Sequence, residues 1–388
     1  MSQYLPTTPD VAPEPRCATT TTSELVDAAP TRGDKLRFVG DGGFYREVKR
    51  RVLEHFERTG RSTKGTLRML VKTTVLLLWG GASYALLVFA ATTWWHTALL
   101  CCSLVFAVAG VAFAIQHDGN HGAYSQRVIV NRLVGMTLDL LGASSYIWHW
   151  KHNIAHHTYT NLDGKDNDID VPFGRLVPGQ PHRRFHRYQQ FYLWGVYSLF
   201  VVYWQLFEDF KQVAEARIAG TPFPRPRGWR LVQMIAGKAL FFGWALVVPA
   251  LFHPWWIVLL CYVAMSMVLS LILVLIFQLA HSVEETALPA LPPDAREVPR
   301  AWAVHQVQAT VDFARGNRLL SWYLGGLNFQ IEHHLFPRIC HVHYARIAGI
   351  VQTTCAEFGV RYTENESLLG AIASHFRWLR QMGRLPSG

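Results

Sequence analysis

Three short runs of the sequence concentrate histidine at spacings that suit metal binding. The run HDGNH supplies His117 and His121, HNIAHH supplies His152, His156 and His157, and QIEHH supplies Gln330, His333 and His334. A further histidine, His281, ends an apolar stretch in QLAHSVEE. Residues i and i+4 of a helix share one face, so we expect the paired histidines of each run to lie side by side.

Neutral imidazole is a nitrogen ligand for iron, zinc, copper and nickel. Eight such rings are too many for one tetrahedral zinc, and they suit two metals that each keep an open position. A pair of irons supplied with external electrons would activate O2, and histidines on several helices would preorganise that site. Asp118 and Glu332, which lie inside the runs, are candidates to orient the imidazoles. We expect no catalytic residue beyond the ligands, and the sequence identifies no substrate-binding residues.

The composition indicates which class of protein carries these runs. The chain has 388 residues, of which 50% are hydrophobic and 16% charged, and its mean hydropathy is +0.12. These values exclude disorder and coiled coil for most of the chain. Lys and Arg outnumber Asp and Glu by 37 to 27, and the basic residues surround long apolar runs, as they do in membrane proteins.

Four apolar runs, at about 73–91, 97–116, 234–252 and 255–279, are long enough to cross a bilayer. They predict an all-α integral membrane protein with four transmembrane helices in two hairpins. Neither hairpin connection contains Lys or Arg, so the positive-inside rule places both termini and residues 117–233 in the cytoplasm. A cytoplasmic helical cap would then carry the His-rich di-metal site.

The remaining segments complete the expected organisation. We expect residues 1–35 to be a disordered tail. Residues 36–72 are predicted to form a basic amphipathic segment at the membrane surface, and a helix that packs on the protein is an equal alternative. Residues 73–360 form the membrane domain, and residues 361–388 a C-terminal cytoplasmic segment. The aromatic stretch 190–207 is expected to be interfacial or buried against other helices, because crossing the bilayer would separate the histidine runs.

The order HDGNH, HNIAHH, QIEHH, with paired spans between the second and third runs, resembles the membrane fatty acid desaturase family. The resemblance covers roughly residues 40–360 and extends to HHTYTNLDGKDNDID and NFQIEHHLFP. Gln330, where many members have His, resembles the front-end subgroup, which includes linoleoyl-CoA-type enzymes. The resemblance implies iron ligation by the seven histidines of the runs and by His281. It leaves Gln330 as a weak, water-mediated or indirect contact.

The same resemblance implies an O2-dependent desaturase that introduces a cis double bond into an acyl-CoA or acyl-lipid, using two iron ions and external electrons. Many relatives carry a fused cytochrome b5 domain with an HPGG motif, which residues 1–70 lack. We therefore expect a separate electron donor, such as ferredoxin or cytochrome b5, to dock on the basic cytoplasmic surface.

Other functions use related patterns. A hydroxylase, ketolase or acetylenase would carry the same runs. A membrane metal transporter or haem carrier would favour ionisable residues deep inside the spans, whereas here the spans carry little beyond Lys238. Nucleic-acid binding is disfavoured because the basic residues flank the spans and no binding motif appears.

Overall fold

The computed structural model describes residues 36–289, 291–292 and 295–385, so the predicted tail at 1–35 lies outside the described residues. Its helices and strands are β1 Arg37–Phe38, α1 Gly43–Thr59, α2 Leu67–Phe89, α3 Trp94–Gly110, η1 Val111–Gln116, α4 His117–Asn120, α5 Val128–Gly135, α6 Thr137–Leu140, α7 Ser145–Trp148, η2 His149–His156, α8 His157–Tyr159, η3 Asn167–Ile169, η4 Arg184–Tyr188, α9 Gln189–Tyr197, α10 Phe200–Tyr203, η5 Trp204–Glu208, α11 Asp209–Glu215, β2 Arg217–Ile218, β3 Thr221–Pro222, α12 Trp229–Phe242, η6 Gly243–Val247, α13 Val248–Ala250, α14 Trp255–His281, β4 Glu297–Val298, α15 Trp302–Ala309, β5 Asp312–Phe313, α16 Arg318–Tyr323, α17 Gln330–Leu335, η7 His341–His343, α18 Tyr344–Glu357, β6 Glu364–Asn365 and α19 Leu368–Met382. The strands form only two-residue pairings, so the described chain is mostly helical.

Four helical stretches are long and apolar enough to cross a membrane, as the sequence predicts. They run from Leu67 to Phe89, Trp94 to Asn120, Trp229 to Ala250 and Trp255 to His281. Most begin or end several residues beyond the predicted bounds, because backbone hydrogen bonding continues past the apolar run. The clearest case is the second span, which continues from α3 through the π-helix η1 into α4, and so carries His117.

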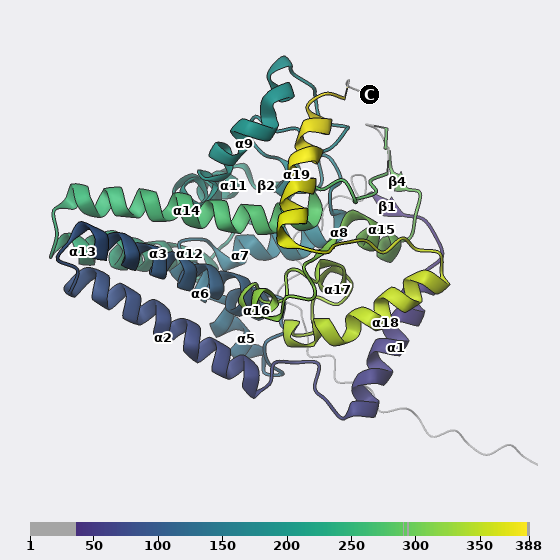
Figure 1. Ribbon diagram of the computed structural model, residues 1–388, viewed down its shortest axis with the longest axis horizontal. Coiled ribbons are helices and arrows are strands. Elements are labelled where there is room, and N and C mark those ends of the chain that lie inside the picture. The colour runs from purple at the N-terminus through teal and green to yellow at the C-terminus, as the bar shows by residue number, and fades with distance from the viewer. Residues whose placement is uncertain (1–35, 290, 293–294, 386–388) are drawn as a thin grey trace, which may run out of the picture.

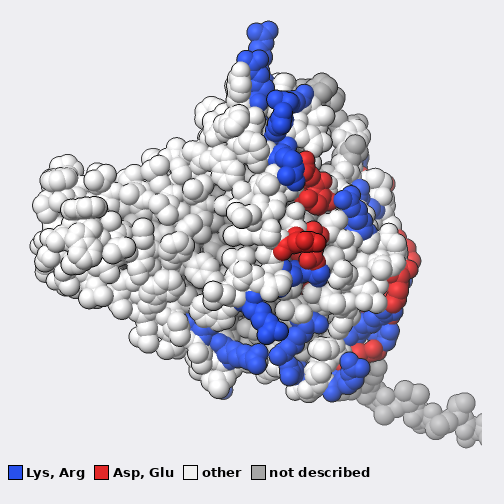
Figure 2. Space-filling view, viewed as in Figure 1, with Lys and Arg blue, Asp and Glu red and all other residues white. Residues whose placement is uncertain are grey.

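The spans form one end of the molecule and the short helices form the other (Figure 1). The end made by the spans shows no charged side chain on the face seen in Figure 2, whereas Lys, Arg, Asp and Glu gather over the broad end. This division matches an apolar part in the bilayer and a polar cap outside it. The chain is therefore a membrane protein.

Helix α1 has the amphipathic pattern that the sequence predicts, but its apolar stripe meets protein. Phe44, Val48, Val52 and Phe56 are buried in a cluster with residues of α15 and α18. Arg51 joins α1 to Glu357 at the end of α18 through a 2.6 Å ion pair. The packed-helix alternative therefore accounts for this stripe. The end of the predicted surface segment 36–72 also forms the first turn of α2.

The aromatic stretch 190–207 breaks into α9, α10 and η5, which pack along α14. Leu193, Tyr197 and Val201 are buried, whereas Phe191 and Phe207 are more than half exposed. None of these short helices is long enough to span a bilayer, and the stretch lies against α14 with apolar rings on its exposed side as well.

The last helix, α19, belongs to the core of the molecule. It packs on α14 and α9, with Ser374, His375 and Leu379 fully buried. The Nδ1 of His375 donates to the carbonyl of Ser282, just beyond the end of α14, across 2.7 Å. The described part of the C-terminal segment 361–388 therefore packs on the membrane domain.

Candidate metal centre

The fold brings all eight predicted histidines into two adjoining clusters. One consists of His117, His121, His152 and His333, and the other of His156, His281 and His334. His157 lies between them, since it forms a further group with His333 and His334. Within each group the possible ligand atoms lie within 4.8 Å of one another, and every member is buried. The rings of His157 and His334 stack with centroids 4.4 Å apart, so the clusters are contiguous.

Several ring nitrogens in these clusters point at no hydrogen-bonding partner among the described residues. They are Nε2 of His117, His121, His333 and His334, and Nδ1 of His157 and His281. A buried polar atom without a partner is costly, and four of these six are Nε2 atoms of histidines that belong to the two clusters. A donor set of this kind, made only of imidazoles with free lone pairs, fits two transition-metal ions such as iron.

The second histidine run does not adopt the α-helix that the spacing suggests. Residues 149–156 form the π-helix η2, whose hydrogen bonds join residues i and i+5. His152 therefore lies beside His157 as well as beside His156, with ring centroids 4.8 and 5.1 Å apart. The Nε2 atoms of His152 and His157 therefore lie 3.3 Å apart. His156 turns toward the other cluster, with its ring centroid 4.7 Å from that of His281. This helical irregularity lets one short segment supply ligands to both clusters.

Hydrogen bonds fix three of the rings from behind. Nδ1 of His156 donates to Asp166 at 3.0 Å, and Nδ1 of His334 donates to the side-chain oxygen of Gln306 at 2.7 Å. Nδ1 of His333 lies 3.2 Å from the hydroxyl of Tyr344. The bonds to Asp166 and Gln306 set the tautomer that leaves Nε2 free, as metal-ligating histidines require, and the contact with Tyr344 holds the ring of His333 in place.

Of these three partners, only Asp166 lies in a stretch that the sequence marks, the HHTYTNLDGKDNDID that contains the end of the second histidine run. Gln306 lies in α15 and Tyr344 at the start of α18, outside the histidine runs. No sequence motif therefore marks either residue as a partner of a histidine. A glutamine in a helix does not, by itself, show that its side chain orients a metal ligand, because most buried polar side chains are hydrogen-bonded to some partner.

Asp118 and Glu332, proposed to orient imidazoles, contact other groups. Asp118 accepts from Nδ1 of His341 at 2.9 Å and from the thiol of Cys340. Glu332 accepts from the hydroxyl of Tyr362 at 3.0 Å. Successive residues of a helix point about 100° apart, so a neighbour of a ligand in sequence generally faces elsewhere.

Gln330 lies at the second cluster. Its side-chain amide lies 2.9 Å from Nε2 of His281, and its side-chain oxygen has no hydrogen-bonding partner among the described residues. Gln330 thus contacts a predicted ligand directly. His149, excluded from the ligand set, bonds Asn153 and joins neither cluster.

Burial keeps most of these imidazoles neutral. Burial is the main cause that lowers the pKa of five of these histidines well below the usual value, and the neighbouring imidazoles lower it further. The five are His121, His152, His157, His333 and His334. His156 differs, because the charges of Asp166 and Asp168 together outweigh the effect of burial and raise its pKa. Neutral rings at physiological pH present lone pairs to a metal instead of competing for protons.

Comparison with known proteins agrees with this geometry. The fatty acid desaturase family model matches residues 92–366. The chain is 37% identical to an sn-1 linoleoyl-lipid 6-desaturase of Arthrospira platensis, over 91% of this chain and 96% of the relative. It is 35% identical to the sn-1 linoleoyl-lipid 6-desaturase of Synechocystis sp., over 90% and 98%. It is 34% identical to an acyl-lipid (8-3)-desaturase of Physcomitrium patens, over 88% and 72%. The chain therefore belongs to the fatty acid desaturase family, and it is an oxidoreductase that acts on fatty acyl chains.

Proposed function

We propose that the chain is an O2-dependent, front-end acyl-lipid desaturase whose two iron ions are held by His117, His121, His152, His156, His157, His281, His333 and His334. The observation that carries the proposal is the pair of adjoining imidazole clusters with unpaired ring nitrogens. A metal transporter would need ionisable groups along its spans, whereas these histidines lie where spans end and in the cap.

The reaction that this site supports removes two hydrogens from adjacent methylene groups. One acyl chain, O2, two electrons and two protons give a cis double bond and two waters, so the electrons must come from outside. The two irons, when bound, would supply the O2 activation and C–H cleavage that no acid–base side chain can perform.

The chain's own residues prepare this chemistry. Asp166, Gln306 and Tyr344 hold three imidazoles in the orientation that a metal requires. The histidines of the second and third runs are at most 6% exposed, so the protein excludes bulk water from the centre. Exclusion of water protects reactive chemistry from side reactions. Gln330 would hold His281 in place rather than replace an imidazole.

The substrate class follows from the relatives. Two of them are named for desaturation of a linoleoyl-lipid at position 6, and this chain covers nearly their whole length. We propose the same substrate here, an 18-carbon chain esterified in a membrane lipid, with the new double bond between carbons 6 and 7.

A separate acidic protein, such as ferredoxin or cytochrome b5, would deliver the electrons on the cytoplasmic side. Neither hairpin connection, 90–93 or 251–254, contains Lys or Arg, and the positive-inside rule then supports a cytoplasmic position for the cap. Near the first cluster, the half-buried His149 has its pKa lowered by burial and then by the charges of Arg230 and Arg338. Lys64 donates to the carbonyls of Gly122 and Arg338 nearby. This basic rim is complementary to an acidic carrier.

Lipid analysis of a host that expresses the chain tests the proposal. With linoleate in the medium, we expect an 18-carbon product with a third double bond at carbon 6, located by mass spectrometry, and no such product from a His333→Ala control. A product with added oxygen would instead identify a hydroxylase. Absence of any new lipid, with an active donor present, would contradict the proposed substrate.

A further inference from the structure

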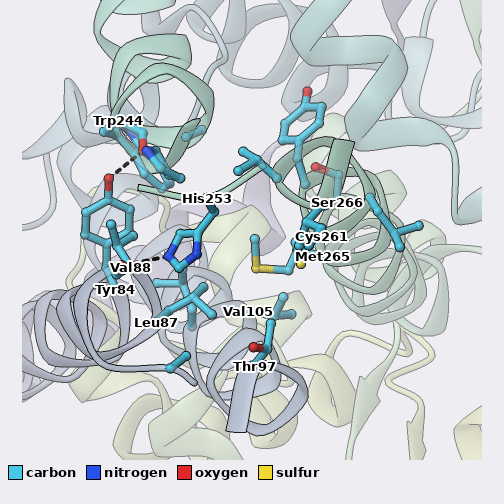
Figure 3. Close-up of a pocket in the computed structure, with 18 of the residues that line it drawn as sticks. Tyr84, Leu87, Val88, Thr97, Val105, Trp244, His253, Cys261, Met265 and Ser266 are labelled. Carbon is cyan, nitrogen blue, oxygen red and sulfur yellow. Dashed lines mark hydrogen bonds between the residues drawn. The ribbon is translucent and has the colours of Figure 1, made fainter. Parts of the chain in front are cut away.

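A cavity of about 540 Å³ lies among the four spans, away from the metal centre. All four spans contribute to its wall, for example through Leu87, Val105, Trp244 and Met265 (Figure 3). A volume of this size is within the range of small-molecule sites, roughly 300–1,000 Å³. The feature is therefore large enough for a ligand and is not a packing defect.

Direct bonds between the two hairpins hold the cavity open at the end remote from the cap. The hydroxyl of Tyr84 donates to the carbonyl of Trp244 at 2.6 Å, and Nε2 of His253 donates to the carbonyl of Val88 at 2.8 Å (Figure 3). The rings of Phe89 and Phe252 meet edge to face, with centroids 5.0 Å apart. The walls are thus fixed relative to one another, so the cavity is part of the fold.

The lining sets the chemistry of the occupant. Among the described residues that line the cavity there is no Lys, Arg, Asp or Glu. Two of its polar side chains are already bonded. The amide of Gln205 donates to the carbonyl of Leu141 at 3.0 Å and its oxygen accepts from Tyr262 at 2.9 Å, and Nε2 of His253 donates to the carbonyl of Val88. The cavity therefore offers little to a polar or charged ligand, and it suits a hydrocarbon chain.

The cavity is separated from the histidine clusters by packed side chains. None of the eight histidines lines the cavity, and the hydrophobic core cluster that contains the lining residues Val105 and Leu269 also contains Phe113 and Leu273. Along α14, Leu269 at the cavity and His281 at the centre are twelve residues apart, which is about 18 Å of helix. The carbons oxidised at the metals therefore do not lie in this cavity.

We propose that this cavity binds one hydrocarbon chain of a bilayer lipid, at a site distinct from the position where the substrate is oxidised. The occupant follows from the surroundings: the walls are membrane spans, so the molecules at the openings are lipid chains. A chain in this position would bridge the two hairpins and stabilise their arrangement.

Photocrosslinking tests the site with the full chain in phosphatidylcholine vesicles. The probe is phosphatidylcholine that carries a diazirine near the end of one acyl chain, and labelled peptides are mapped by mass spectrometry. We expect label on residues 97–108 and 257–269. Ala245→Phe and Val105→Phe, which fill the cavity from two different walls, should each reduce that label at least about five-fold, because added core volume displaces other groups.

Val247→Phe is the matched control. Val247 lies two residues from Ala245 but is 58% exposed and does not line the cavity, so its label should equal that of the unmodified protein. Elution of a variant as a single species in size-exclusion chromatography shows that it is folded. If only one of the two cavity-filling variants folds, that variant is enough for the test. Label that persists in the folded filling variants, or that falls equally in Val247→Phe, would overturn the proposal.

Discussion

The ring of His334 and the side-chain amide of Gln306 form a 2.7 Å hydrogen bond between two buried residues that are 28 positions apart. Since the amide oxygen accepts, Nδ1 of His334 carries the proton and Nε2 is left unpaired within the second cluster. Gln306 also accepts a hydrogen bond from Thr160, which follows the second histidine run. One glutamine therefore links two of the three runs.

Replacing Gln306 should weaken metal binding without removing a ligand. In Gln306→Leu the buried ring loses its acceptor and its tautomer is no longer fixed, and such changes lower metal affinity about 10–100-fold. Gln306→Glu keeps an acceptor at the same place and should retain more metal. Iron per protein, measured after dialysis against a weak chelator, distinguishes the two. Equal iron in Gln306→Leu and the unmodified protein would refute this role.

Removal of a proposed ligand should abolish activity and lower the iron content together. We expect this of His156→Ala, because His156 is one of only three histidines in its cluster. His149→Ala is the control for iron binding, since His149 lies in the same π-helix but in neither cluster. Iron analysis and product formation are measured on the same purified samples. Normal iron and activity in His156→Ala would count against the whole assignment.

Acid should destabilise the protein through its buried neutral histidines. Burial lowers the pKa of His375 to about 4, whereas an exposed histidine titrates near 6.5. Below about pH 6.5 the unfolded chain binds a proton that the folded chain does not, so this stabilising contribution is fully present above that pH and is lost progressively toward pH 4. The melting temperature of His375→Gln should therefore change less between pH 7.5 and 5 than that of the unmodified protein. Parallel melting curves for the two proteins would contradict this.

The stability of the protein should fall when a buried ion pair between the third span and α11 loses one partner. Lys238 lies 2.8 Å from Asp209, and both side chains are at most 6% exposed. Lys238→Met leaves the carboxylate buried without its cation, which costs about 3–5 kcal/mol. The double variant Lys238→Met/Asp209→Asn removes both charges and should recover part of that loss. Thermal unfolding in detergent measures the difference, and equal stability of the single variant and the unmodified protein would show that the pair contributes nothing.

The basic rim should govern the rate of electron delivery. Arg338 is exposed, so Arg338→Glu should lower kcat/KM for an acidic carrier mainly at low ionic strength, because salt screens exposed charges. Its iron content should not change. An equal rate for both proteins with the carrier at low salt would exclude this surface as the docking site.

The sequence by itself determined the class of the protein and most of the proposed ligand set. Apolar length and charge placement are local properties, so the four spans could be read from composition along the chain, and histidine at helical spacing marked the three runs. Even the family was evident from the order of those runs, as the comparisons confirm.

Only the tertiary structure decided how these parts meet. It assigned the histidines to two clusters, brought His281 to His156 across more than a hundred residues, and showed that a π-helix, not an α-helix, carries the second run. It also gave Asp118 and Glu332 partners other than the eight histidines, and supplied Gln306 and Tyr344 in their place. The physical reason is that a side chain's direction depends on local helical pitch, and its partner on packing between distant segments. Neither is encoded in the spacing of residues along one stretch of chain.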